Sequence, residues 1–254
     1  MNGPFSHPWL IFVLSFAMMS LCAVFGARVL GIRFPHDKDA REDFDIVLAA
    51  ALTLLGLIIG FTFSMAVSRF EQRKNYEEDE ANAIGTEYTR AGLLAAADTT
   101  KVRALLKSYV DERILYYQTR DAGQLRQIDA RTQELQAQLW SAVEAPVRAG
   151  QPNPILALVV SGMNDVLNSQ SYTQAAWWNR IPPAAWGLMV LIALLCNMLL
   201  GVRASRLKQR GLLLEVLPVM LSVAFLLIAD IDSPRGGYIH VRPLNLMSLA
   251  ASLR

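Results

Sequence analysis

The stretch from Phe44 to Leu94 most constrains the fold of this chain, because it joins a long apolar run to a long charged run without a helix-breaking residue. From Phe44 to Ser68 only Asp45 is charged, and about 25 helical residues suffice to cross a hydrocarbon core of roughly 30 Å. From Arg69 onward the sequence turns strongly polar, yet no proline occurs between positions 35 and 146. The pattern therefore predicts one helix that lies half in lipid and half in water.

One face of this span carries a small residue at every fourth position, namely Gly56, Gly60, Ser64 and Ser68. Small residues allow helix backbones to approach closely in lipid, so the stripe predicts a helix-packing face. The bulky residues Phe61, Phe63 and Met65 lie on other faces of the same helix. They either pack against lipid and neighbouring helices or, if several copies of the helix surround an axis, form an apolar constriction that gates by dewetting.

Charged residues follow directly after the apolar run. Arg69 and Arg73 lie one helical turn apart, at the depth where guanidinium groups reach the lipid headgroups. In an oligomer, a ring of such arginines instead concentrates anions at a pore mouth. The acidic run 77–80 predicts a solvated helix face, although Glu80 and Glu87 are two turns apart and are placed to face a common partner.

Three further apolar runs predict membrane spans, at residues 9–30, 184–202 and 212–231. A composition of 53% hydrophobic and 18% charged residues is that of a membrane protein. A signal peptide is the alternative for the first run, but no lysine or arginine precedes it and its apolar core is long. The connector 31–45 mixes both charges and predicts a solvated loop.

The polar stretch between the second and third spans predicts a bundle of helices. Residues 102–117 place apolar side chains and Arg113 on one stripe. Asp98 is a candidate N-cap for this helix, Asp121 opens the next one, and Asn153 before Pro154 opens a third. The spacing of apolar residues from 125 to 142 predicts that the first two of these helices form an antiparallel hairpin.

The predicted fold is therefore all-α, with four transmembrane helices and a helical extramembrane domain inserted between the second and third spans. Its parts are residues 1–68, the first and second spans; 69–180, the helical domain continuous with the second span; 181–232, the third and fourth spans; and 233–254, a C-terminal tail. A short extended piece is expected at 238–242.

The sequence argues against catalysis. Its three histidines are His7, His36 and His240, so neither a Ser-His pair nor the Glu-x-x-His pairs of a di-iron bundle can form in the helical domain. No glycine-rich phosphate loop or cysteine cluster is present, so we expect no enzyme activity and no cofactor. A net charge of +2 gives no indication of nucleic-acid binding.

Asp230 and Asp232, with Ser233, are weak candidates for a metal site because they place hard oxygen ligands in one turn. Two carboxylates are few for calcium, which takes six to eight oxygen ligands. A turn that ends the last span is the favoured interpretation, with Pro234 and the glycine pair 236–237 directing the chain back. Cys22 and Cys196 each lie in an apolar run, and we predict no disulfide.

The orientation in the membrane has two interpretations. The connector 201–211 holds four cations and no acid, so the positive-inside rule places it in the cytoplasm and the helical domain on the opposite side. On the side of the helical domain, the cations close to the membrane are nearly as numerous as those on the opposite side, which is the second interpretation. The charge rule is slightly favoured, because it counts a short loop well and a long domain poorly.

The runs LLGLIIGFTFSMAVSRFEQRKNYEEDEANAIGTEYTRAGLL and IADIDSPRGGYIHV resemble the bacterial bestrophin-like family of membrane proteins, a distant relation of the bestrophin anion channels. The resemblance spans about Phe44 to Val241. Of the acidic calcium clasp that follows the last span of animal bestrophins, only Asp230 and Asp232 remain. The resemblance implies a homo-oligomer, a pore lined by the second span and a helical domain outside the membrane, oriented toward the cytosol.

Two functions fit these features. The first is passive conduction of chloride or another small anion by a homo-oligomer in the bacterial inner membrane, surrounded by lipid, with Phe61, Phe63 or Met65 at the constriction and Arg69 and Arg73 at the mouth. The second is a non-conducting scaffold or sensor with a helical head. An assembled ring with a continuous hydrated path along the second span distinguishes the first from the second.

Overall fold

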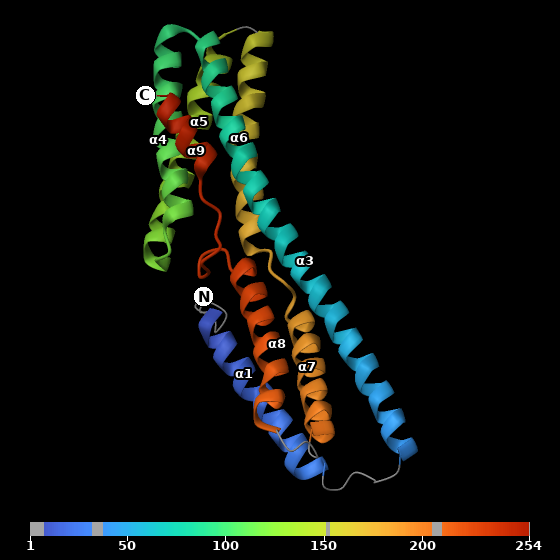
Figure 1. Ribbon diagram of the computed structural model, residues 1–254. Coiled ribbons are helices and arrows are strands. Elements are labelled where there is room, and N and C mark those ends of the chain that lie inside the picture. Colours follow the sequence, from blue (N-terminus) through green and yellow to red (C-terminus); the bar gives the residue numbers. More distant parts are fainter. Residues whose placement is uncertain (1–7, 32–37, 151–152, 205–209, 254) are drawn as a thin grey trace. The chain divides into compact units, whose positions relative to one another are not determined.

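The computed structural model describes residues 8–31, 38–150, 153–204 and 210–253, and all regular structure in these ranges is helical (Figure 1). The all-α class is therefore confirmed. The helices are α1 (Pro8–Phe25), α3 (Lys38–Arg90), α4 (Ala96–Gln118), α5 (Ala122–Ala149), α6 (Pro154–Trp178), α7 (Pro183–Ala204), α8 (Arg210–Asp232) and α9 (Leu244–Ser252). A π-helical turn, η2 (Gly26–Leu30), follows α1, and a 3₁₀ turn, η3 (Ala91–Leu93), follows α3.

The chain divides into two compact units. The first unit comprises Met1–Arg69 and Arg180–His240, and the second comprises Phe70–Asn179 and Val241–Arg254. Four helical segments of the described chain are long and apolar enough to cross a membrane, as predicted: Trp9–Leu30, Arg41–Leu93, Pro154–Ala204 and Leu214–Asp232. The third of these segments contains α6 as well as α7, whereas the sequence placed the span in α7 alone.

Helix α3 confirms the prediction of one uninterrupted helix, which continues without a break from the apolar run to Arg90. The expected loop 31–45 is wrong from Lys38 onward, because α3 begins there. Acidic residues near a helix N-terminus interact favourably with the helix dipole, which explains why this charged segment is helical. The cation-rich residues 205–209 of the orientation argument, and residues 32–37, lie outside the described residues.

In the first unit, α1 packs against both α7 and α8 (Figure 1). The contact with α7 depends on two glycines. A β-carbon built on Gly201 would overlap the carbonyl oxygen of Ala23, and one built on Gly26 would overlap that of Met198. The two backbones therefore touch at these positions, which is the close approach that small residues permit between helices in lipid.

The second unit contains the predicted hairpin of α4 and α5, followed by α6. The backbone N–H of Gln124 donates to the Asp121 carboxylate over 2.8 Å, and that of Ile155 donates to the Asn153 side chain over 2.9 Å. Both predicted N-caps are thus confirmed. The predicted cap at Asp98 is wrong, because α4 begins two residues earlier and Asp98 lies in its first turn.

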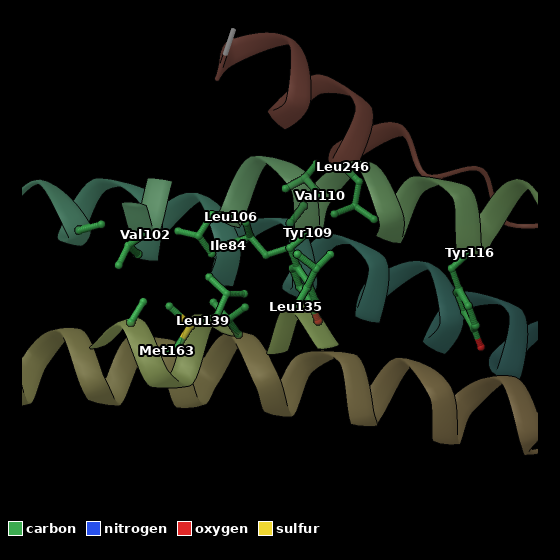
Figure 2. Packing of buried hydrophobic residues seen from close by; sticks show 14 of the residues in the cluster. Ile84, Val102, Leu106, Tyr109, Val110, Tyr116, Leu135, Leu139, Met163 and Leu246 are labelled. Atoms are coloured by element: carbon green, nitrogen blue, oxygen red, sulfur yellow. The ribbon is translucent and has the colours of Figure 1, made fainter. Parts of the chain in front are cut away.

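Figure 2 shows the apolar core of the second unit, where side chains of α3, α4, α5, α6 and α9 meet. Helix α9 was not predicted from the sequence, where residues 233–254 were predicted only as a C-terminal tail. Its residue Leu246 is fully buried in this core, beside Val110 of α4. The expected extended piece at 238–242 forms no strand and leads instead into α9.

Candidate functional site

The apolar half of α3 has one buried face and a broad exposed face. Leu48, Leu55, Thr62 and Ala66 are buried, and they lie within one narrow sector of the helix. The small-residue stripe Gly56, Gly60, Ser64 and Ser68 lies on the opposite side and is exposed in the single chain. A β-carbon on Gly56 or Gly60 would have no neighbour within 4 Å among the described residues, so the stripe is open at these two positions.

The bulky constriction candidates lie on two sides of α3, with Phe61 and Met65 one turn apart on one side and Phe63 on another. Phe61 is 65% exposed, whereas Phe63 is 38% and Met65 37% exposed. Residues two apart on a helix are separated by roughly 200°, so Phe61 and Phe63 cannot face the same axis. Leu57, 53% exposed, lies one turn from Phe61 on the same side and was missed in the sequence.

The two arginines after the span have different surroundings. Arg69 is half-buried, and its Nη2 lies 3.6 Å from the sulfur of Met65. Arg73 is almost fully buried and extends the line of buried residues on α3 into the second unit. The two predicted pore-mouth arginines therefore differ in burial, and the burial of Arg73 favours a packing role.

After Arg73, where the sequence predicted a solvated helix face, three acids lie on the buried face of α3. Glu77, Glu80 and Glu87 are buried, whereas Glu78 and Asp79 are exposed. The spacing of the three buried acids follows the three-and-four pattern of a packed helix face. That spacing, together with the arginine on the apolar stripe of α4, was the signal that could have revealed their burial.

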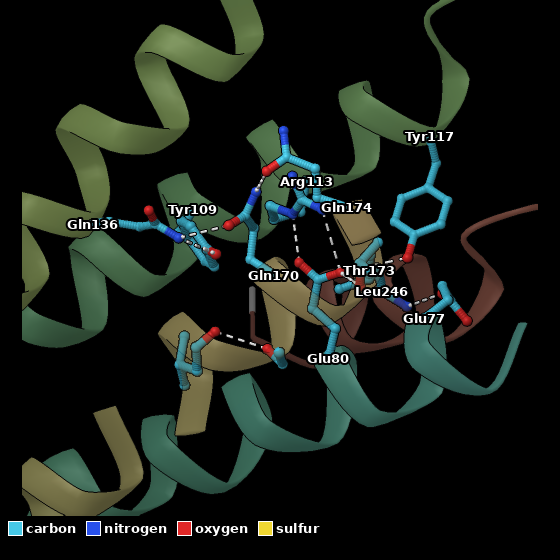
Figure 3. Close-up of polar contacts among 12 residues, drawn as sticks. Glu77, Glu80, Tyr109, Arg113, Tyr117, Gln136, Gln170, Thr173, Gln174 and Leu246 are labelled. Carbon is cyan, nitrogen blue, oxygen red and sulfur yellow. Dashed lines mark hydrogen bonds and ion pairs between the residues drawn. The ribbon is translucent and has the colours of Figure 1, made fainter. Parts of the chain in front are cut away.

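Glu80 forms a buried ion pair with Arg113 of α4 (Figure 3). The Arg113 Nε donates to Glu80 Oε1, and Nη2 donates to Oε2 over 3.4 Å. The guanidinium also lies over the ring of Tyr116, 4.4 Å from its centre. Burial alone would lower the pKa of Arg113, but the neighbouring Glu80 carboxylate raises it overall, so the guanidinium stays charged.

Two hydroxyl groups complete the surroundings of Glu80. Thr173 of α6 donates to Glu80 Oε2 over 3.0 Å, and the Tyr117 hydroxyl lies 3.4 Å from the same oxygen. Burial, and secondly the Glu80 charge, raises the pKa of Tyr117, which therefore stays a hydroxyl donor. Glu80 thus ties α3 to both α4 and α6, and the cluster fixes the packing of the second unit.

Glu77 joins α3 to α9. Its carboxylate accepts hydrogen bonds from the Leu246 N–H over 2.9 Å and from the Asn245 side chain over 2.7 Å. The first N–H groups of a helix lack acceptors within the helix. The side chain of Pro243, the N-cap residue of α9, provides no hydrogen-bond acceptor. Glu77 therefore caps α9 from another helix.

Replacing Glu77 by alanine is expected to release α9 from the second unit. The buried Leu246 N–H would lose its acceptor, and an unsatisfied buried group costs about 1–3 kcal/mol. Hydrogen exchange of the amides at 244–252 should accelerate by roughly tenfold, since about 1.4 kcal/mol corresponds to that factor. Glu78→Ala, one position along at an exposed site, is the control; equal exchange in both variants would contradict this role.

The loop after α8 holds the two weak metal candidates. The Asp230 carboxylate accepts hydrogen bonds from the N–H groups of Tyr238 and Ile239, each over 2.8 Å. The Asp232 carboxylate accepts from the Ile181 N–H over 3.1 Å. No group of three or more metal-ligating acids, histidines or cysteines occurs in the described ranges. The Asp230 carboxylate thus stabilises the turn after α8, whereas the Asp232 carboxylate binds the connector that precedes α7.

These features define a multi-pass helical membrane protein with an apolar helix face left open and a polar, tightly packed second unit. A family model for the bestrophin-like domain matches residues 13–246. The chain therefore belongs to the bestrophin-like family, which confirms the resemblance noted in the sequence. No curated protein sequence matches the chain.

Solved structures of bacterial bestrophin homologues have the same fold. A single-residue variant of the homologue from Klebsiella pneumoniae superposes with a TM-score of 0.66 at 15% sequence identity, covering 97% of each chain. A structure of the Klebsiella homologue phased with zinc gives a TM-score of 0.64 at 16% identity, covering 96% of each chain. At this identity the similarity establishes the fold.

Proposed function

We propose that this chain is a bestrophin-like anion channel, which assembles as a homo-oligomer in the bacterial inner membrane and conducts passively along α3. The family membership and the fold support the class of protein. The observation that carries the proposal is the open face of α3, because this helix leaves both its small-residue stripe and its largest apolar side chains uncovered in the single chain.

In this assembly, copies of α3 surround a central axis. The buried line from Leu48 to Ala66 faces the rest of its own chain, and the open face is left for neighbouring copies and the pore. The small-residue stripe packs against adjacent helices, because it permits close approach. Leu57, Phe61 and Met65 lie one turn apart on one exposed side and form the constriction, whereas Phe63 lies on another side and flanks it. An apolar ring of this kind gates by excluding water.

Native mass spectrometry of the protein in a mild detergent tests the assembly. We expect a single oligomer of several copies. A preparation that is monomeric at all detergent concentrations would remove the pore, because one α3 cannot enclose a path.

Arg69 supplies the positive charge at the mouth of this pore, since it lies directly after the apolar run and next to Met65. Arg69→Glu reverses the local field, and we expect it to lower the chloride-to-sodium permeability ratio by roughly tenfold. Reversal potentials in planar bilayers under a salt gradient measure this ratio. Arg120→Glu, which makes the same charge change at an exposed site between α4 and α5, should leave the ratio unchanged.

The alternative function is a non-conducting scaffold or sensor. An oligomer that forms but passes no ions in any variant would favour it. Equal selectivity in wild type and Arg69→Glu, in a protein that does conduct, would refute only the role of Arg69.

A further inference from the structure

Glu87 is a buried acid that the cluster around Glu80 does not include. It lies on α3 in the second unit, it is fully buried, and neither carboxylate oxygen has a hydrogen-bond partner among the described residues. The carboxylate points at Gly162 of α6, where a β-carbon would overlap Oε2. The glycine therefore provides the space that the carboxylate occupies between the two helices.

The other two buried acids of α3 differ from Glu87 in their partners. Glu77 accepts two hydrogen bonds, and Glu80 is paired with Arg113 and Thr173. A buried carboxylate without donors or a paired cation is strongly disfavoured in its charged form, and such a group normally binds a proton instead. The surroundings of Glu87 therefore suit the neutral form of its carboxyl group.

The charged groups around Glu87 do not provide a compensating pair. Arg90 lies one turn along the same helix and its Nη1 also reaches Gly162 beside Glu87 Oε2, but the two side chains form no ion pair in the described chain, and Asp165 of α6 adds negative charge one turn from Gly162. Arg103 of α4 is held elsewhere: its Nε donates to the Tyr88 carbonyl over 3.1 Å and its guanidinium lies over the Tyr88 ring.

We propose that Glu87 is a proton-binding site on which the packing of α3 against α6 depends: it holds a proton at neutral pH, and release of that proton in mildly alkaline solution loosens α6. An ionised carboxylate in this place must attract water or draw the Arg90 guanidinium closer, and either change disturbs the contact of α3 with Gly162. The proposal concerns the second unit alone and does not rest on the channel function.

The direction of the pH dependence follows from the carboxyl group. Burial raises the pKa of Glu87 to about 8; Arg90 opposes the shift and Asp165 adds to it. In the unfolded chain the pKa of a glutamate is about 4.3. Between these values the folded chain holds a proton that the unfolded chain has lost, so stability falls as pH rises through this window and levels off above about pH 8.

Thermal unfolding of the full chain in detergent, from pH 5 to pH 9, tests the proposal with Glu87→Gln. The amide is neutral at every pH, so the variant should lose less stability than wild type as pH rises, with the two melting curves diverging by several degrees at pH 9. Glu134→Gln is the control, because Glu134 is an exposed glutamate paired with Arg131, and it should keep the wild-type profile. The measured quantity is the change in melting temperature with pH, so a constant difference between variant and wild type at every pH does not affect the result.

Infrared spectroscopy of the protein gives a second measurement that needs no stable variant. The carbonyl band of a protonated carboxylic acid should be present at pH 7 and disappear by pH 9, and hydrogen exchange around residue 162 should rise over the same range. A wild-type protein with no such band at pH 7, or a Glu87→Gln variant as sensitive to pH as wild type, would overturn the proposal.

Discussion

Replacing Arg113 by methionine should destabilise the second unit by roughly 3–5 kcal/mol, because it leaves the Glu80 carboxylate buried without a counter-charge. Both side chains are fully inaccessible to solvent, so water cannot replace the lost partner without opening the core. The cation–π contact with Tyr116 is lost as well. For a chain of this size the melting temperature should fall by on the order of 10 °C.

Two variants separate the buried charge from other effects of the substitution. Arg113→Met combined with Glu80→Met removes both charges and should recover most of the lost stability, since apolar replacements of buried ion pairs are often neutral or stabilising. Arg131→Met breaks the exposed pair with Glu134 and should cost less than about 1 kcal/mol. A double variant no more stable than Arg113→Met alone would show that the buried charge is not the cause.

Replacing Gly201 by alanine is the second change with a large expected effect. The new methyl group would overlap the Ala23 carbonyl oxygen and lie 3.0 Å from the backbone nitrogen of Ala27. These atoms belong to the backbone of α1 and of the following turn η2, so no side-chain rotation can relieve the overlap, and this segment must separate from α7. We expect a loss at or above about 3 kcal/mol, the upper range for overpacking, measured as melting temperature and monodisperse yield in detergent.

Gly187→Ala provides a matched control on the same helix. A β-carbon at position 187 has no neighbour within 4 Å, so the substitution should be neutral or should stabilise α7 by up to about 1 kcal/mol through helix propensity. A loss of about 3 kcal/mol implies a difference in melting temperature of roughly 6 °C. If Gly201→Ala and Gly187→Ala instead melt within about 2 °C of each other, the close contact between α1 and α7 is not part of the native fold.

Local signals in the sequence predicted the helices well. Absence of proline together with the change from apolar to polar residues predicted that α3 continues past the membrane span, and the side chains of Asp121 and Asn153 predicted where α5 and α6 begin. These features act over one or two helical turns, so they depend little on the rest of the fold. Helix α9 had a similar signal, since Leu246, Leu249 and Leu253 repeat with helical spacing after Pro243, but it was overlooked.

Contacts between distant helices could not be predicted in the same way. The small-residue stripe of the second span was predicted to pack, yet within the single chain the close contact is made by Gly26 and Gly201. Each of these is an isolated glycine near the end of a span, and the register between α1 and α7 is not encoded in either helix alone. Arg113 was correctly placed on the apolar stripe of α4, but identifying Glu80 as its partner required knowledge of how α3 and α4 are aligned.

Chloride flux from purified protein in liposomes tests the proposed channel most directly. We predict that wild-type protein releases trapped chloride faster than empty vesicles, and that Phe61→Ala or Leu57→Ala raises the rate further by widening the apolar constriction. Met65→Ala should raise it as well, because Met65 lies one turn from Phe61 on the same side, whereas Phe63→Ala should change it less because Phe63 faces another side. Release at the empty-vesicle level for wild type and all four variants would contradict conduction along α3, since removing the barrier would then reveal no pore.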